Sequence, residues 1–182
     1  MLHAEHFASG APLESRFTGT HVEVILRARG WLAAEATPEQ AAWCERAATL
    51  LGPHAENEAA LADWLGLVFD YDARSIIANV ASHVTLSRYA ARDVLRRLAP
   101  LLLDGPPLDS DRFKEVVTAL KSAMESRGRE LFHPIRLALA GRAGEGELDR
   151  VILLLDEAAK LQWSTPVKST RARILEFCSA LD

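Results

Sequence analysis

A helical repeat of apolar residues runs through almost the whole chain, and it constrains the fold more than any other feature. Its clearest instance places residues at the i, i+3, i+4, i+7 and i+11 positions of one helix face: Phe113, Val116, Val117, Leu120 and Met124. No segment alternates apolar and polar residues with a period of two, and none has the turn chemistry of a β-hairpin. The sequence therefore predicts an all-α fold, a helical bundle of about nine helices.

Capping residues and glycine or proline breaks set the expected helix boundaries. Thr37, Pro38 and Gln40 form a capping box that opens one helix, and Gly52-Pro53 ends it. The other expected N-terminal positions are Asn57, Asp72, Thr85 or Ser87, Asp109 and Pro134. The helix after Asp72 is expected to reach Val80. Pro100 is expected to kink or shorten the helix that contains it. Gly128 and Gly141 are each expected to end the helix that precedes them.

The same breaks divide the chain into three parts. Residues 1–19 lack periodicity and are expected to form a flexible N-terminal arm with a genuine start at Met1. Gly105-Pro106-Pro107 is the clearest interruption of the helical pattern. We therefore predict two packed helical subdomains, at 20–104 and 105–182.

Length and composition exclude several classes of protein. The chain has 182 residues, of which 49% are hydrophobic and 25% charged, as in soluble globular proteins. It contains no uncharged apolar run of the ~18 residues that a membrane span needs, and His3, Glu5 and His6 do not fit a secretory signal. Cys44 and Cys178 belong to no metal or redox motif, so a reducing, cytoplasmic location is expected.

The net charge of −4 conceals two regions of opposite sign. The first 70 residues contain ten acidic and four basic side chains, whereas residues 112–142 contain seven basic and three acidic ones. Arg88, Arg92, Arg96 and Arg97 form a second basic cluster, in which Asp93 is the acid. Such a distribution favours an anionic partner, although an arginine-rich genome produces the same composition.

The sequence contains no constellation that predicts catalysis. Asp70 and Asp72 stand at a helix start, where a capping role is more common than a catalytic pair. No two histidines have metal-ligand spacing, and the glycines at 141, 144 and 146 follow a helix instead of opening one. We expect no catalytic residue, no metal and no cofactor.

The segment from Arg127 to Arg142 is the most informative motif. An apolar helix beginning at Pro134 and ending at Gly141 explains its apolar positions. It does not explain why Arg136 interrupts the apolar run, or why Arg129 flanks it.

From Arg129 to Arg142 the sequence reads basic-x-Leu-Phe-x-Pro-Ile-Arg-x-Ala-Leu-x-Gly-Arg, and Glu-Leu follows at 147–148. This order resembles the C-terminal anticodon-binding region of bacterial glutamyl-tRNA synthetases. The likeness is most specific over 129–148 and extends over about 20–180. The likeness is weaker in three other segments. These are 61–72 with Trp64; 113–127; and Pro166-Val167-Lys168-Ser169 with Arg173.

The resemblance implies an all-helical, cage-like body that grips the anticodon stem-loop of a tRNA. The family's class I catalytic domain and its ATP-binding motifs have no counterpart in this chain. Two departures bear on the anticodon surface. The family's threonine before the glycine is Ala140 here, and its Gly-Pro turn reads Glu145-Gly146.

Anticodon loops are single-stranded, so their bases can stack on guanidinium planes and be read at their edges. The resemblance and the local charge together suggest Arg136 as a base contact and Arg129, Arg142 and Lys121 as phosphate contacts. Arg74 is a weaker candidate, and His133 completes the set. A surface charge or an internal pair with Glu130, Glu145 or Glu147 is the alternative for each arginine, and capping or packing is the alternative for His133.

The leading hypothesis is a stand-alone anticodon-binding protein that binds tRNA-Glu or tRNA-Gln without aminoacylating it. One alternative is a trans-acting subunit of a split glutamyl-tRNA synthetase, whose catalytic chain is a separate partner. The other is a degenerate module that serves as a protein-interaction scaffold, which the acidic first 70 residues, Ala140 and Glu145 favour.

Overall fold

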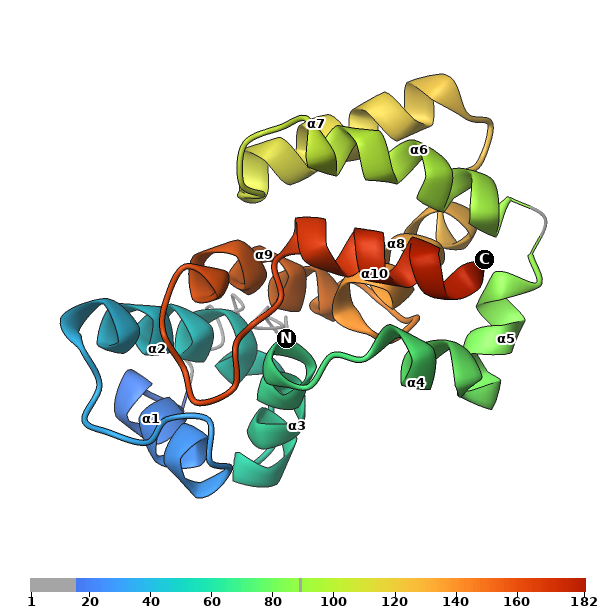
Figure 1. Ribbon diagram of the computed structural model, residues 1–182. Helices are drawn as coiled ribbons and strands as arrows, with labels where there is room; N and C mark the ends of the chain where they lie inside the picture. Colours follow the sequence, from blue (N-terminus) through green and yellow to red (C-terminus); the bar gives the residue numbers. More distant parts are fainter. Residues whose placement is uncertain (1–15, 89) are drawn as a thin grey trace, which may run out of the picture.

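The computed structural model describes residues 16–88 and 90–182. These residues form ten α-helices and one short 3-10 helix, Gly52–His54, with no strand among them. The helices are α1 (Gly19–Ala28), α2 (Pro38–Leu51), α3 (Glu58–Phe69), α4 (Ala73–Ala78), α5 (Val80–Leu86), α6 (Ala91–Leu103), α7 (Ser110–Ala123), α8 (Arg129–Ala140), α9 (Glu147–Ala159) and α10 (Thr170–Leu181) (Figure 1). The prediction of an all-α fold is confirmed.

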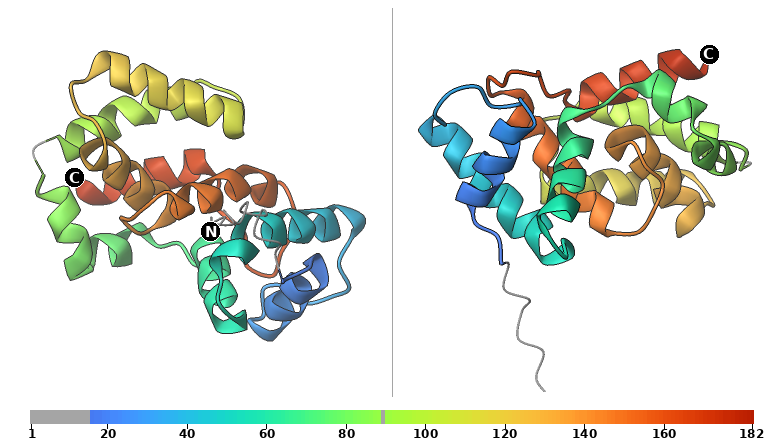
Figure 2. Two further views of the ribbon diagram at one scale, coloured as in Figure 1. Left: turned by 180° about the vertical axis from the view of Figure 1, so that it is seen from behind. Right: turned by 90° about the horizontal axis from the view of Figure 1, so that it is seen from below.

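The helices are arranged around α8, α9 and α10. Helices α1, α2 and α3 form one end of the molecule, where α2 packs against α9 (Figures 1 and 2). Helices α6 and α7 run side by side along the opposite edge, and α6 also packs against α8 and α10. The short helices α4 and α5 follow one another, with α4 against α10 and α5 against α8.

One hydrophobic core connects these elements. At the α1–α3 end it contains an aromatic cluster, in which Trp31 stacks on Phe69 with ring centroids 4.8 Å apart. Trp43 and Trp163 meet edge to face at 5.3 Å, and each also contacts Phe69. The buried indole of Trp43 donates its N–H to the carbonyl oxygen of Leu154 in α9 at 3.1 Å. The segment after α9 is therefore fastened to the N-terminal helices.

Several capping residues predicted from the sequence act as expected. The side chain of Thr37 accepts a hydrogen bond from the backbone N–H of Gln40, and the side chain of Gln40 accepts one from the backbone N–H of Thr37. Asn57 caps α3 through the N–H of Ala60. The carboxylate of Asp109 likewise caps α7.

The region after Asp72 differs from the prediction of one helix reaching Val80. Helix α4 ends at Ala78, and Asn79, in an extended conformation, caps the separate helix α5. Asp72 accepts the hydroxyl of Ser75 and makes no side-chain cap. The first backbone N–H of α4, that of Ala73, is accepted by Glu176 of α10 at 2.8 Å.

The next helix also begins elsewhere than expected. Thr85 lies inside α5, and α6 begins at Ala91, after both Thr85 and Ser87. Pro100 lies within α6, which continues to Leu103.

Two further corrections concern α8. This helix begins at Arg129, and Pro134 lies inside it rather than at its start. Gly128 does not end the preceding helix: α7 stops at Ala123, and Gly128, with φ of +56°, immediately precedes α8. Gly141 ends α8 in the left-handed conformation, as predicted.

Of the predicted N-terminal arm 1–19, residues 1–15 lie outside the described residues, and Thr18 caps α1 at Gly19. The division into 20–104 and 105–182 stays a prediction. The hydrophobic core takes residues from both of these ranges.

Candidate nucleic-acid interface

Helix α8 and the turn that follows it hold most of the candidate residues. Gly141 has φ of +84°, and this positive value lets the chain reverse at once toward α9. A Cβ atom at Gly141 would lie 3.3 Å from Cδ1 of Ile76, so α4 packs closely against the turn. The start of the turn is thereby held against α4.

Arg136 is buried, with only 8% of its surface exposed. Its Nε and Nη2 donate to the two carboxylate oxygens of Asp149 at 2.8 and 3.0 Å, and its Nη1 donates to the carbonyl oxygen of Gly144 at 2.9 Å. The guanidinium carbon lies 4.7 Å from the centroid of the Phe132 ring. All three guanidinium nitrogens therefore hold α8, the turn and α9 together.

The internal partner of Arg136 is Asp149 and not one of the three glutamates considered from the sequence. Asp149 lies in the first turn of α9, where a carboxylate is also favoured by the helix dipole. A bidentate pair of this kind is planar and charge-assisted, which makes it a rigid joint. A contact between Arg136 and tRNA stays a prediction.

Three other candidate residues are exposed around this joint. Arg129, whose side chain is 79% exposed, approaches Glu145 with Nη2 to Oε1 at 3.6 Å. Lys121 of α7 lies with Nζ 5.7 Å from the Phe132 ring, whose other cationic neighbour is Arg136. Arg142 is exposed directly after Gly141. Exposed cations of this kind suit phosphate contacts.

His133 carries an unpartnered buried atom. Its Nε2 is shielded from solvent and has no hydrogen-bond partner. Burial lowers the pKa of His133, and the nearby Arg136, Arg129 and Arg88 act in the same direction, while Glu145 opposes them. The imidazole is therefore favoured in its neutral form, which presents one donor and one acceptor nitrogen.

Arg74 is exposed on α4, more than fifty residues before the start of α8. Within the described part of the chain, no ion pair or side-chain hydrogen bond joins it to α8 or to the turn. The structure thus brings together Lys121, Arg129, His133 and Arg136 through α8 and Phe132, with Arg142 directly after them, and does not join Arg74 to them.

Sequence reasoning missed the structural role of Arg173. This side chain is fully buried and donates to four backbone carbonyls, those of Leu67, Val68, Leu139 and Lys168. Three of these carbonyls belong to the last turns of α3 and α8, where helix dipoles place negative charge. Burial lowers the pKa of Arg173 to about 10, so it remains protonated at neutral pH.

A periodic signal for this role was present in the sequence. Thr170, Arg173, Ile174 and Phe177 occupy the i, i+3, i+4 and i+7 positions of α10, and all four are buried. The guanidinium also lies 4.5 Å from the ring centroid of Tyr71, whose hydroxyl donates to the carbonyl oxygen of Ala138 in α8. Together these two side chains fix the end of α8 against α3 and α10.

Two kinds of feature were not found in the part of the chain that the structure describes. Within residues 16–88 and 90–182, no group of three or more His, Cys, Asp or Glu side chains lies close enough to hold a metal ion. None of the helices in these residues is long and apolar enough to cross a bilayer.

Comparisons with known proteins identify the family of the chain. The sequence profile of a family described as anticodon binding domain matches residues 23–161, which include all of α8 and α9. The chain is also 27% identical over 121 residues to a glutamate–tRNA ligase 2 from Syntrophus aciditrophicus (strain SB). The match covers 63% of this chain and 23% of that ligase. No solved structure matches the chain.

Proposed function

Because the chain belongs to the anticodon-binding domain family, we propose that it binds the anticodon arm of a tRNA and does not itself charge that tRNA. The predicted resemblance to this family is confirmed. Since the chain spans 23% of the similar ligase, an aminoacylation activity is not carried over to it. We place this binding function in the cytoplasm, with tRNA-Glu and tRNA-Gln as the first candidates.

The observation that carries the proposal is the group of exposed cations around α8, inside the segment that matches the family. Lys121, Arg129 and Arg142 are exposed, and Arg129 alone of the three has an ion-pair partner among the described residues, at 3.6 Å. Phosphates bound by such side chains release counterions, so the affinity depends strongly on salt.

Arg136 has a different task in this proposal. Its guanidinium fixes the turn between α8 and α9 by its hydrogen bonds to Asp149 and Gly144. Arg142 and Glu145 lie in this turn, so their positions depend on it. We assign Arg136 as a positioning residue. Its replacement by lysine, which lacks the planar fork, should loosen the turn while keeping the charge.

A titration of labelled tRNA-Glu and tRNA-Gln, followed by fluorescence anisotropy at several salt concentrations, tests the proposal. The triple variant K121A/R129A/R142A should bind at least about tenfold more weakly, and its slope of log K against log salt should fall by about three. The matched control is R16A/R27A/R29A, which removes three exposed positive charges at the α1 end. Wild-type protein that does not bind tRNA at low salt would refute the proposal.

A second function is favoured by the short span of the ligase that the chain matches. In this alternative the protein supplies the anticodon-binding part to a separate catalytic chain. Adding it to a glutamyl-tRNA synthetase that lacks its anticodon-binding region should then raise the rate of tRNA charging. An unchanged rate, alongside normal tRNA binding, would reject this alternative and leave the first proposal standing.

A further inference from the structure

Glu145, in the turn between α8 and α9, approaches one of the exposed cations around α8. Its Oε1 lies 3.6 Å from Nη2 of Arg129, and the two side chains are 67% and 79% exposed. Among the described residues, this is the ion pair of both side chains, and neither makes a side-chain hydrogen bond to a third residue. An anion that reaches Arg129 therefore meets a carboxylate at the same guanidinium.

The backbone on both sides of Glu145 is fixed by hydrogen bonds. The carbonyl oxygen of Gly144 accepts Nη1 of Arg136 in α8 at 2.9 Å. The carbonyl oxygen of Glu145 itself accepts the N–H of Leu148 in α9 at 3.2 Å. The side chain can rotate about its own bonds, but it starts from a fixed point beside α8.

Glu145 also acts on the basic face of α8. Arg129, His133 and Arg136 occupy the i, i+4 and i+7 positions of this helix and share one face. Burial lowers the pKa of His133, and Glu145 opposes this shift, while Arg136 and Arg129 reinforce it. Asp149 already neutralises Arg136, so Arg129 is the arginine of this face that Glu145 pairs with.

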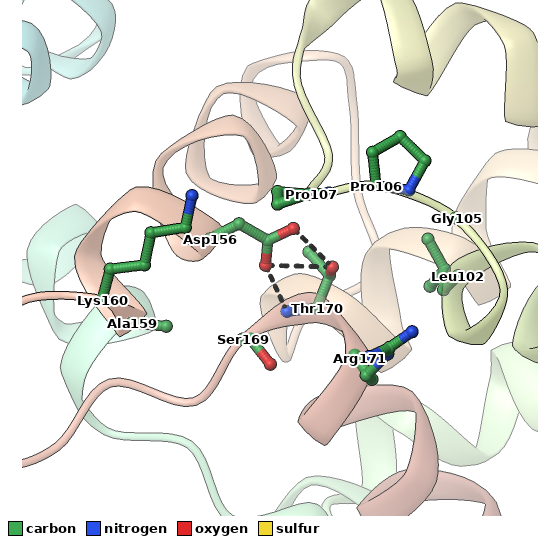
Figure 3. A pocket seen from close by; sticks show the side chains of 10 residues that line it. All are labelled: Leu102, Gly105, Pro106, Pro107, Asp156, Ala159, Lys160, Ser169, Thr170 and Arg171. Carbon is green, nitrogen blue, oxygen red and sulfur yellow. Dashed lines mark hydrogen bonds between the residues drawn. The ribbon is translucent and has the colours of Figure 1, made fainter.

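Two other carboxylates show what a tightly held acid looks like in this protein. Asp149 accepts two bonds from its arginine at 2.8 and 3.0 Å. Asp156, in the pocket shown in Figure 3, accepts the N–H and hydroxyl of Thr170 at 2.8–3.1 Å and the N–H of Leu108 at 2.7 Å. Both side chains are partly shielded from solvent. Glu145, with a single long contact, is not held in this way.

The weakness of this contact allows a ligand to displace it. Exposed ion pairs contribute little because water screens them, whereas a phosphate can accept two parallel bonds from one guanidinium. The displaced carboxylate stays close, because its backbone is fixed, and it repels a bound phosphate. Glu145 thus opposes phosphate binding at Arg129 in two ways.

We infer that Glu145 competes with a backbone phosphate of the bound tRNA for Arg129 and thereby limits the affinity of the interface. This inference rests on the proposed function and deepens it, because it names the residue that restrains binding at the same site. Removing the negative charge at this one position then strengthens binding without adding a contact.

The test measures tRNA affinity by anisotropy for wild-type protein, Glu145→Gln, Arg129→Ala and the double variant. Glu145→Gln removes the charge and keeps the size of the side chain. It should bind tRNA about threefold to tenfold more tightly at low salt, and the gain should shrink as salt screens the exposed charges. In the Arg129→Ala background, the same substitution should change the affinity by less than about twofold.

Two controls accompany these titrations. Glu35→Gln removes an exposed acid from the connection between α1 and α2, and it reports the effect of net charge alone. Thermal unfolding reports any structural role of Glu145. Its replacement by glutamine should shift the midpoint by less than about 3 °C, because an exposed ion pair contributes little to stability.

The titrations distinguish this inference from the proposed function. If wild-type protein binds tRNA and Glu145→Gln binds no more tightly than Glu35→Gln, the inference is wrong and the proposed function stands. An equal gain with and without Arg129 also overturns the inference, since Glu145 then acts by general repulsion. If Glu145→Gln binds tRNA and wild-type protein does not, the inference holds and the proposed function fails. If neither binds, both fail.

Discussion

Arg173 shows how much one side chain can contribute to this fold. Among the described residues it forms no ion pair, and its N–H groups are accepted by backbone carbonyls that include those at the ends of α3 and α8. A buried cation is costly unless it is hydrogen-bonded, and each carbonyl that loses its donor would also be left unsatisfied. The arginine and its carbonyl partners thus depend on one another.

Replacing Arg173 with methionine should lower the free energy of unfolding by about 3–5 kcal/mol, because it leaves two buried and two partly buried carbonyls without their donor. Urea denaturation followed by circular dichroism measures this loss. Arg173→Lys should also destabilise the protein, since one ammonium group cannot reach four carbonyls in the guanidinium geometry. The exposed Arg27→Met serves as the control. A loss below about 1 kcal/mol for Arg173→Met would contradict this account.

His133 makes stability depend on pH in a definite direction. Burial lowers its pKa in the folded protein below the ordinary value of 6.5. Well above pH 6.5 both folded and unfolded chains hold a neutral ring, so the group has no effect. As the pH falls below 6.5, the unfolded chain binds a proton more readily, and the folded state loses stability.

The variant His133→Gln should therefore lose less stability than wild-type protein between pH 7 and pH 5.5. Urea titrations at pH 7, 6.5, 6 and 5.5 give the two curves. The same substitution at the exposed His83 provides the comparison for a general loss of histidine. Parallel curves for wild-type protein and His133→Gln would show that the ring titrates alike in both states.

At the scale of elements, the end of α8 depends on the backbone of one glycine. Gly141→Ala should destabilise the protein by about 1–2 kcal/mol, because φ of +84° disfavours a Cβ atom. The added methyl group would also press on Ile76 at 3.3 Å. Thermal unfolding measures the effect.

Gly30 supplies a matched control for this prediction. Its φ of +75° is similar, but a Cβ atom there would meet no other atom within 4 Å. Gly30→Ala should therefore cost only the backbone strain, and Gly141→Ala should cost more. Equal losses for the two variants would mean that the contact between α4 and the turn has no effect on stability.

Helix ends were predictable where the capping signal is local. Thr37, Asn57 and Asp109 each bond to a backbone N–H three residues later, and such spacing is visible in the sequence. Asp72 offers the same signal, but its carboxylate accepts the hydroxyl of Ser75, and Glu176, about a hundred positions away, accepts the first N–H of α4. This contact depends on how α10 packs against α4 and leaves no trace in local sequence.

The start of α8 was predicted wrongly for a related reason. Proline favours the first position of a helix because it lacks an N–H, and this preference predicts a helix that begins at Pro134. In the structure Pro134 lies inside α8, which begins at Arg129. It is buried there, with buried Leu131 and Ile135 on the same helix. Tertiary packing thus outweighs the lost hydrogen bond.

The candidate site was predictable in composition and only partly in arrangement. The motif identified α8 and its cations, but it did not reveal that Arg136 is paired with Asp149, thirteen residues further along. Arg88 was noted as part of a basic cluster, and its place beside His133 depends on how α5 packs against α8. Such contacts between helices are set by three-dimensional packing and not by spacing.

At the scale of the whole molecule, α6 is the helix that most directly joins the two predicted subdomains. It precedes the Gly105-Pro107 break but packs against α7, α8 and α10, which all follow it. The aromatic cluster makes a second connection, because Trp163 contacts Trp43. Both connections lie within the one hydrophobic core. We therefore expect the described helices to unfold together.

Leu120→Ala in α7 tests this expectation at a distance. Leu120 is fully buried, and its truncation should lower stability by about 2–5 kcal/mol. Tryptophan fluorescence reports mainly on the aromatic cluster at the α1–α3 end, whereas far-ultraviolet circular dichroism reports on all helices. If the helices form one cooperative unit, both signals should shift by the same amount and keep a single midpoint. Midpoints that differ between fluorescence and circular dichroism, or a two-step circular dichroism curve, would instead show that 105–182 unfolds separately, because the substitution would then weaken only the part in which it lies.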